Sequence, residues 1–236
     1  MSADIHESSQ ADFAKAIKKS RLAILPVGSL EQHGPHLPVS TDSIISEYLA
    51  RQTASRLGAF LFPTINYGVS FEHAPMLNIS VTHSVLSALV CDICSSIAAN
   101  GMTKIVIING HHGNMGSLQY IAQDLLGRVP AGTSINTIHY WHLLKEGFDH
   151  AGEVETSLIL AMAPQLVKMD KAEANAKKLA KSKTAYSSLT NAPGSFTKIT
   201  GNGVWGNPKN ATAEKGMQLI DEIVKGLSKT ILELDA

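Results

Sequence analysis

Short apolar runs alternate with longer amphipathic segments along the chain. The runs have the length of buried strands and lie at residues 21–27, 60–62, 104–109 and 134–140. The segments repeat apolar residues at helical spacing and lie at residues 42–56, 84–100, 114–126, 158–162 and 212–234. Strands that alternate with helices are typical of parallel βαβ units, in which helices cover both faces of one sheet. No linker or repeat interrupts the pattern, which predicts a single α/β domain over residues 1–236.

Individual residues indicate where some of these elements begin and end. Asp42 is the expected N-cap of the helix over 42–56, and Gly58 follows that helix as its stop. Asn114 is the expected cap of the helix over 114–126. The stretch from Pro193 to Pro208 is rich in Gly, Asn and Ser, which predicts a long surface loop.

Composition and charge are those of an ordinary globular protein. The 236 residues suffice for one large domain, and 44% of them are hydrophobic and 17% charged. Because 20 basic and 20 acidic residues cancel, nothing indicates a nucleic acid or a membrane as partner. No apolar stretch reaches the roughly 18–20 residues of a membrane helix. The first twenty residues lack the apolar region of a secretory signal and the chain has two cysteines, so we expect a cytoplasmic protein.

Histidine is the most informative residue type. Nine of the ten histidines lie between His33 and His150, and several follow a predicted strand directly. Histidine is the commonest metal ligand and the acid or base of neutral pH. Because the ligands of open parallel sheets bind beyond the carboxyl ends of the strands, we expect the chemistry in three segments that follow strands.

The first segment, GSLEQHGPHLPVSTD at residues 28–42, follows the predicted strand over 21–27. Glu31 and His33 point to the same side of an extended backbone, because side chains alternate there. Asp42 follows at a helix N-terminus, where a carboxylate is favoured. An imidazole, a carboxylate and a second carboxylate that can bridge form a partial shell for a divalent metal. The alternative is a polar loop with a capping Asp.

The second segment, NGHHGN at residues 109–114, follows the predicted strand over 104–109. His111 and His112 point in opposite directions if the backbone is extended, so one can face a metal while the other faces the protein. A turn with capping residues would explain Asn114 but not two adjacent histidines.

The third segment, HAGEVETS at residues 150–157, precedes the apolar helix over 158–162. His150 ahead of two carboxylates offers a general acid or base, and the carboxylates offer at least one further ligand. Glu153 and Glu155 are both candidates for that ligand, and Glu153 is also a candidate catalytic group. Acidic residues in a first helical turn are also favoured by the helix dipole alone, so these residues leave the choice open.

Together the three motifs make the chain resemble the creatininase family of amidohydrolases, from about Leu22 to Pro164. The resemblance implies a three-layer α/β/α sandwich with a mainly parallel central sheet. It implies two divalent metal ions per subunit, Zn, Mn or Fe(II), and a homohexamer. It also implies a metal shell with Asp42 as the bridge, whose ligands are Glu31, His33, Asp42, His111 and Glu155. His150 is the residue that the resemblance assigns to proton transfer.

Two departures from creatininase itself bear on the substrate. Creatininase has an acidic ligand two residues after the first histidine of the second motif, where this chain has Gly113. The second metal ion would then take its carboxylate from Glu155, or failing that from Glu153. Creatininase also carries a tryptophan shortly before its HAG histidine, and residues 145–149 contain none. Creatinine is therefore not the expected substrate.

The NGHxGN motif is more similar to two other branches of the family. One cleaves a formamide in flavin and deazaflavin biosynthesis, and the other is the peptidase of mycofactocin maturation. We therefore expect a dinuclear hydrolase of a non-peptide C–N bond in a small molecule, with a formamide deformylase as the first candidate. The alternatives are a creatinine amidohydrolase, a mycofactocin-type peptidase, and a non-catalytic metal-binding or ligand-sensing protein.

Overall fold

A computed structural model describes residues 3–145, 147, 149–175 and 192–234. Its centre is a five-stranded sheet in the order β1-β3-β2-β4-β5, and all neighbouring strands are parallel. The strands are β1 (Ala3–Asp4), β2 (Leu22–Val27), β3 (Phe60–Leu61), β4 (Lys104–Asn109) and β5 (Ser134–His139). The parallel sheet confirms the prediction, although the two-residue strand β1 was not expected.

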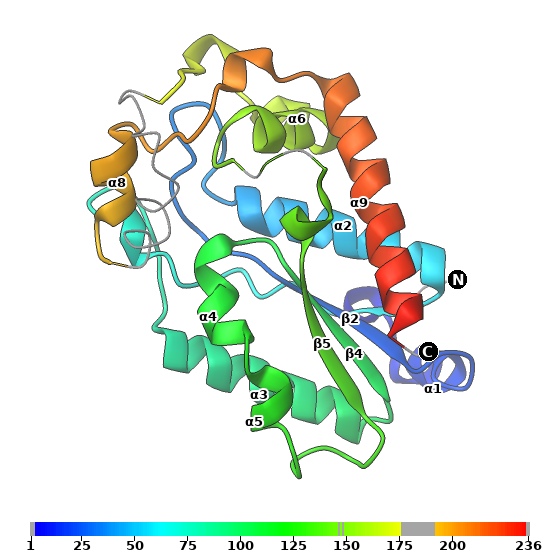
Figure 1. Cartoon of the computed structure of the whole chain (residues 1–236). Helices are drawn as coiled ribbons and strands as arrows, with labels where there is room; N and C mark the ends of the chain where they lie inside the picture. Colours follow the sequence, from blue (N-terminus) through cyan, green and yellow to red (C-terminus); the bar gives the residue numbers. More distant parts are fainter. Residues whose placement is uncertain (1–2, 146, 148, 176–191, 235–236) are drawn as a thin grey trace.

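Helices cover both faces of this sheet (Figure 1). One face packs against α2 (Thr41–Leu57), α6 (Glu153–Met162) and α9 (Ala213–Glu233). The other packs against α3 (His83–Ala99), α4 (Met115–Leu118) and α5 (Ile121–Asp124), with α1 (Gln10–Ala16) at its edge. The alternation of β4 explains both layers, since Val106 and Ile108 enter the first core while Ile105 and Ile107 enter the second. The predicted three-layer α/β/α sandwich is confirmed.

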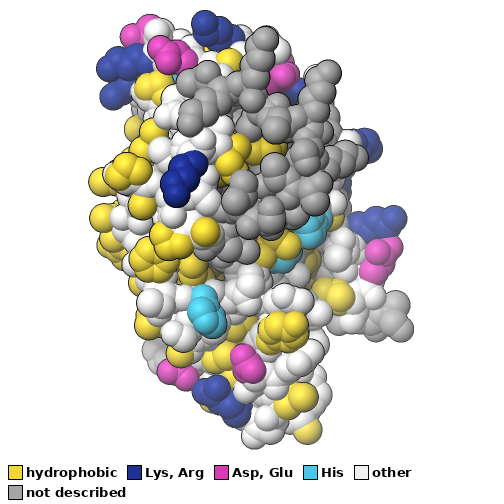
Figure 2. All heavy atoms as spheres, turned by 60° about the vertical axis from the view of Figure 1, so that its left-hand side comes forward, with side chains coloured by type: hydrophobic (Ala, Val, Ile, Leu, Met, Phe, Trp, Pro, Cys, Tyr) yellow, Lys and Arg dark blue, Asp and Glu magenta, His cyan; other side chains and the backbone are white. Residues whose placement is uncertain are grey.

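Shorter helical elements connect these layers. The α-helix α8 (Ser195–Thr200) precedes α9. The 3-10 helices are η1 (Ile5–Glu7), η2 (Phe71–His73), η3 (His112–Asn114), η4 (Tyr140–Leu143), η5 (Pro164–Leu166), η6 (Met169–Lys171) and η7 (Pro208–Asn210). Among the described residues, no helix is both long and apolar enough to cross a bilayer. In the coloured part of the face in Figure 2, charged side chains of both signs are scattered rather than gathered into a patch.

Three local predictions are corrected by the structure. The helix α2 begins at Thr41 after Ser40, so Asp42 lies in its first turn and does not cap it. The predicted helix over 114–126 is two short helices, because the backbone leaves helical geometry at Tyr120 (φ −111°, ψ 7°). The predicted loop over 193–208 contains α8, which the polar composition concealed and which is held by the buried Phe196 and Thr200.

The order of the strands creates a crevice at one edge of the sheet. The chain leaves β2 through α2 toward β3, and it leaves β4 through α4 and α5 on the opposite face toward β5. Because these connections diverge, the carboxyl ends of β2 and β4 form the topological switch point where ligands of open sheets bind. Val27 and Asn109 are paired in register, so the segments after residues 27 and 109 emerge side by side.

Candidate metal centre

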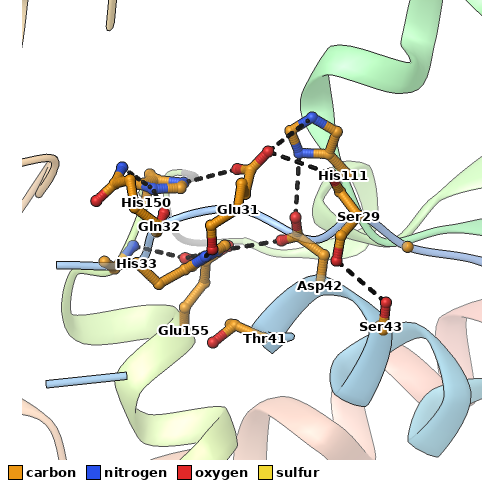
Figure 3. A network of polar contacts seen from close by, with 12 residues as sticks. Ser29, Glu31, Gln32, His33, Thr41, Asp42, Ser43, His111, His150 and Glu155 are labelled. Atoms are coloured by element: carbon orange, nitrogen blue, oxygen red, sulfur yellow. Dashed lines mark hydrogen bonds and ion pairs between the residues drawn. The ribbon is translucent and has the colours of Figure 1, made fainter. Parts of the chain in front are cut away.

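The three predicted segments meet in this crevice. Glu31 and His33 lie in the loop after β2, Asp42 in the first turn of α2, His111 after β4, and Glu155 in the first turn of α6. All five side chains are buried, and none is more than 4% exposed. Figure 3 shows them pointing toward one another from these separate elements. The structure therefore brings together the five residues that the resemblance implies as metal ligands.

Two glycines allow α2 to approach the ends of both strands. A Cβ at Gly28 would lie 2.5 Å from the Cα of Ser43, and a Cβ at Gly110 would lie 2.4 Å from the carbonyl oxygen of Asp42. Contacts of this length are impossible for a side chain. The first turn of α2 can therefore pack directly against the crevice and present Asp42 to it.

A short antiparallel bridge fixes the loop that carries Glu31. Glu31 pairs with Asn78, the amide N–H of Gln32 donates to the carbonyl of Leu77 (2.8 Å), and that of Ile79 donates to Leu30 (2.8 Å). These bonds hold the loop extended, so that Glu31 and His33 face the same side, as predicted.

Asp42 lies between two groups of donors. Its Oδ1 is 3.2 Å from Nε2 of His33, and its Oδ2 is 3.2 Å from Nδ1 of His111. The potential ligand atoms of Glu31, Asp42 and His111 lie within 4.8 Å of one another, and so do those of His33, Asp42 and Glu155. Each oxygen of one carboxylate thus serves a different group, which is the arrangement of a bridging ligand.

Backbone carbonyls orient the two imidazoles. Nδ1 of His33 lies 3.1 Å from the carbonyl oxygen of Glu31, and Nε2 of His111 lies 2.8 Å from that of Val69. Because a carbonyl oxygen only accepts, each of these nitrogens donates its N–H. In the neutral imidazole, the form that binds a metal ion, the other nitrogen, Nε2 of His33 and Nδ1 of His111, is then bare and faces Asp42. Histidine ligands of metals are usually oriented by such bonds.

Several buried atoms of the centre have no hydrogen-bond partner among the described residues. They are Oε1 of Glu31, Nε2 of His33 and Oδ2 of Asp42. A buried polar atom left without a partner costs on the order of 1–3 kcal/mol. Divalent cations would satisfy all three atoms, and the oxygen and imidazole donors are those that Zn²⁺ and Mn²⁺ accept. The residues fit a pair of metal ions.

The electrostatics of the centre favour cations. Although burial favours the neutral form of His33, the carboxylates of Asp42 and Glu155 raise its pKa to about 10. Burial, together with repulsion from Asp42, raises the pKa of Glu155 to about 8. Despite its own burial, Asp42 has a pKa well below the usual range because His33 and His111 lie beside it. Several carboxylates therefore share one buried space, which positive charge stabilises.

His150 lies beside the two groups of donors that share Asp42. Its Nδ1 is 3.9 Å from Oε1 of Glu31, and its ring centroid is 4.3 Å from that of His33. Glu31, His33 and His150 also form a third set of atoms within 4.8 Å of one another. Burial, followed by repulsion from His33 and His73, holds the pKa of His150 well below its usual range. A neutral imidazole at this position can accept a proton.

Two sequence candidates lie away from the donors. The carboxylate of Glu153, considered as a ligand and as a catalytic group, pairs with Nζ of Lys215 at 2.7 Å. Its neighbour Glu155 points into the centre instead, because residues two apart on a helix face different directions. His112 lies at the rim of the cavity, and its ring centroid is 5.8 Å from that of Trp141.

Four further side chains contribute to the centre and were not among the predicted site residues. They are Gln32, Glu72, His73 and Phe196. His73 brings Nε2 to 3.0 Å from Oε1 of Glu31, and Glu72 brings Oε1 to 3.7 Å from Nε2 of His111. Both belong to η2, which does not directly follow a predicted strand, so only the adjacency of Glu and His could have indicated them. Phe196 gave no signal in the sequence.

Comparison with known proteins identifies the family of the chain. A family model described as creatininase, creatinine amidohydrolase, matches residues 6–231. The chain belongs to the creatininase family. The expectation of a metal-binding hydrolase of this family is thereby confirmed, while the substrate is not fixed by family membership.

Curated members of the creatininase family with different activities are similar to the chain. The mycofactocin precursor peptide peptidase of Mycobacterium ulcerans is 34% identical over 214 residues, 85% of this chain and 80% of that protein. The creatinine amidohydrolase of Pseudomonas putida is 27% identical, over 89% of this chain and 88% of that protein. The 2-amino-5-formylamino-6-ribosylaminopyrimidin-4(3H)-one 5'-monophosphate deformylase of Methanothermobacter marburgensis is 30% identical over 61% of each chain.

Solved creatininase structures share the fold over nearly the whole chain. One, described as creatininase Mn, is 25% identical, has a TM-score of 0.83, and covers 99% of this chain and 98% of its own. A creatininase variant described as Zn-Zn type is 24% identical with a TM-score of 0.80.

Proposed function

We propose that the chain is a dinuclear metal-dependent amidohydrolase that cleaves the C–N bond beside a carbonyl group. The observation that carries this proposal is the pair of donor groups that share Asp42. Glu31, Asp42 and His111 would hold one ion, and His33 and Glu155 would hold the other together with Asp42. Buried donors without partners support the same assignment.

The side chains around the ions would orient the donors and transfer the proton. When bound, a pair of divalent cations lowers the pKa of water toward neutrality and polarises a carbonyl oxygen. Asp42 keeps the two donor groups adjacent, and the carbonyls of Glu31 and Val69 keep the two imidazoles in their binding tautomers. His150 holds a neutral imidazole beside Glu31; its Nδ1 would take a proton from the attacking water and pass it to the departing nitrogen, a contribution of typically 10²–10⁴-fold.

A small formamide or amide is the first candidate substrate. The NGHxGN motif and the similarity to the deformylase support this class.

Hydrolysis of a peptide bond is the second candidate. It is favoured by the similarity to the mycofactocin precursor peptide peptidase, which extends over 85% of this chain, against 61% for the deformylase. Both reactions use the same attack on a carbonyl carbon, so the donors described above suit either one.

Metal removal followed by a substrate panel tests the proposal. The purified protein is stripped with chelator, reloaded with Zn²⁺ or Mn²⁺, and assayed against formamides, small amides, creatinine and short peptides. We expect activity only in the reloaded protein, and the preferred class separates the two candidates. Full activity without metal would overturn the mechanism. Two tightly bound ions without hydrolysis of any class would favour a non-catalytic metal-binding protein.

A further inference from the structure

Two imidazoles beside the metal centre are joined by a single side-chain amide. We propose that Gln32 is a positioning residue that fixes the tautomers of His73 and His150, so that His73 presents an N–H to the centre and His150 a bare nitrogen. The assignment of a role to these nitrogens rests on the proposed function. The tautomers themselves follow from hydrogen-bond donors and acceptors alone.

Backbone groups determine which way the Gln32 amide points. Oε1 accepts the amide N–H of Gly34 (2.9 Å), and Nε2 donates to the carbonyl oxygen of Gly203 (3.1 Å). If the amide were turned over, its oxygen would face the Gly203 carbonyl and its NH₂ would face the Gly34 N–H. Neither contact is a hydrogen bond, so only one orientation satisfies both backbone groups.

The orientation of the amide sets the tautomer of His73. An NH₂ group has two hydrogens, and one is already bound to Gly203. The other points to Nδ1 of His73, which lies 2.8 Å from Nε2 of Gln32. This nitrogen must therefore be bare, and a neutral His73 carries its hydrogen on Nε2. This Nε2 lies 3.0 Å from Oε1 of Glu31, on the side of the metal centre.

The same residue sets the tautomer of His150 through its backbone. Nε2 of His150 lies 3.2 Å from the carbonyl oxygen of Gln32 and 3.2 Å from its Nε2, whose two hydrogens are already used. Only an N–H on His150 Nε2 satisfies that carbonyl. Nδ1 of His150 is then bare on the side of Glu31, where a proton acceptor is needed.

Packing keeps both rings in contact with this amide. The ring of Phe196 lies 4.7 Å from the ring of His73 and 4.7 Å from that of His150, measured between centroids. Gln32 is 7% exposed, and a Cβ at Gly203 would overlap its side-chain amide, so the backbone of Gly203 packs directly against that amide. One glutamine gives two similar imidazoles opposite roles toward the same carboxylate.

Nitrogen NMR of histidine side chains reads these tautomers directly. We would record long-range ¹H–¹⁵N spectra of ¹⁵N-labelled protein loaded with Zn²⁺, and assign the signals with single histidine variants. Both His73 and His150 should show a protonated Nε2 and a bare Nδ1. A protonated Nδ1 on either ring of the wild-type protein would overturn the proposal.

Substitution of Gln32 supplies the second measurement. Gln32→Glu keeps an oxygen for the Gly34 N–H but turns an acceptor toward His73, so Nδ1 of His73 should become protonated. In Gln32→Glu we expect two bound ions per chain to remain and kcat to fall at least tenfold. Gln32→Met, which offers no donor and no strong acceptor, should give mixed tautomers of His73. The exposed Gln119→Glu is the matched control and should behave as wild type.

The outcomes separate this inference from the proposed function. An unchanged His73 tautomer in both Gln32 variants would overturn the positioning role, whatever the activity. Wild-type protein with the expected tautomers but no metal-dependent hydrolysis would instead refute the proposed function and leave the positioning role intact.

Discussion

Replacement of His150 by glutamine separates its two nitrogens. The amide nitrogen of a glutamine can take the place of Nε2 and keep the bond to the carbonyl of Gln32, whereas nothing replaces Nδ1, 3.9 Å from Oε1 of Glu31. If Nδ1 carries the proton to the leaving nitrogen, kcat should fall by about 10²–10⁴. This corresponds to roughly 2.7–5.4 kcal/mol of transition-state stabilisation.

Stability and metal content should change little in the same variant. The ring of His150 packs against those of His33, His73 and Phe196, with centroids 4.3–4.9 Å apart, and a glutamine keeps part of that contact. We expect a loss of about 1 kcal/mol, or about 2–4 °C in Tm for a chain of this size. The measurements are steady-state kinetics, elemental analysis and thermal melting, with the exposed His83→Gln as control.

Two results would refute this reasoning about His150. If kcat in His150→Gln stays within a few-fold of wild type, another group handles the proton. If one of two ions is lost, His150 is a ligand in the set that it forms with Glu31 and His33.

Three further changes test other parts of the structure. Asp42→Asn should lose both ions in elemental analysis because both donor groups share this carboxylate, whereas Glu155→Gln should lose one; an Asp42 variant that keeps both would contradict the bridge. Gly113→Ala places a Cβ 2.2 Å from the carbonyl oxygen of Val69 and 2.6 Å from Oε1 of Glu72, so it should destabilise the fold by about 1–3 kcal/mol in urea unfolding and weaken metal binding. Gly116→Ala, which meets no atom within 4 Å, is its control, and equal effects of both would refute the close contact. Burial, and next the charge of His33, lower the pKa of His36 to about 4. Between pH 6.5 and 4 the unfolded chain therefore binds more protons than the native chain, so stability should fall as the pH falls through that window. His36→Gln should flatten this fall by about 1–3 kcal/mol in melts at stepped pH, and an unchanged slope would contradict the assignment.

Much of the fold could be predicted because the central strands are continuous apolar runs. The prediction for β4 coincides with its observed bounds, Lys104–Asn109, and all but the first residue of the run at 21–27 is β2. The helices α3 and α9 were found through their long apolar periodicity. Elements that depend on distant partners were missed, among them β1, whose two residues are strand only by pairing with β3.

Site residues that directly follow a strand could be predicted from the sequence. Those that only tertiary contacts bring to the centre could not. Glu31, His33 and His111 each follow a strand, so a general rule about parallel sheets selects them. Glu72 and His73 lie in η2, and the bridge between Glu31 and Asn78 helps to fold this part of the chain back over the centre. The periodicity of the sequence does not predict that pairing. The choice between Glu153 and Glu155 also required the direction in which α6 presents its first turn.

The shared carboxylate of Asp42 has a thermodynamic consequence beyond chemistry. The donors come from the loop that leads into α2, from α2 itself, from the loop after β4 and from α6, so each cation bound there would tie these parts of the native state together. By mass action, an ion that binds only the native chain adds about 4.1 kcal/mol when its free concentration is a thousand times its Kd. We therefore expect the thermal stability of this protein to depend on the free metal concentration as well as on the chain.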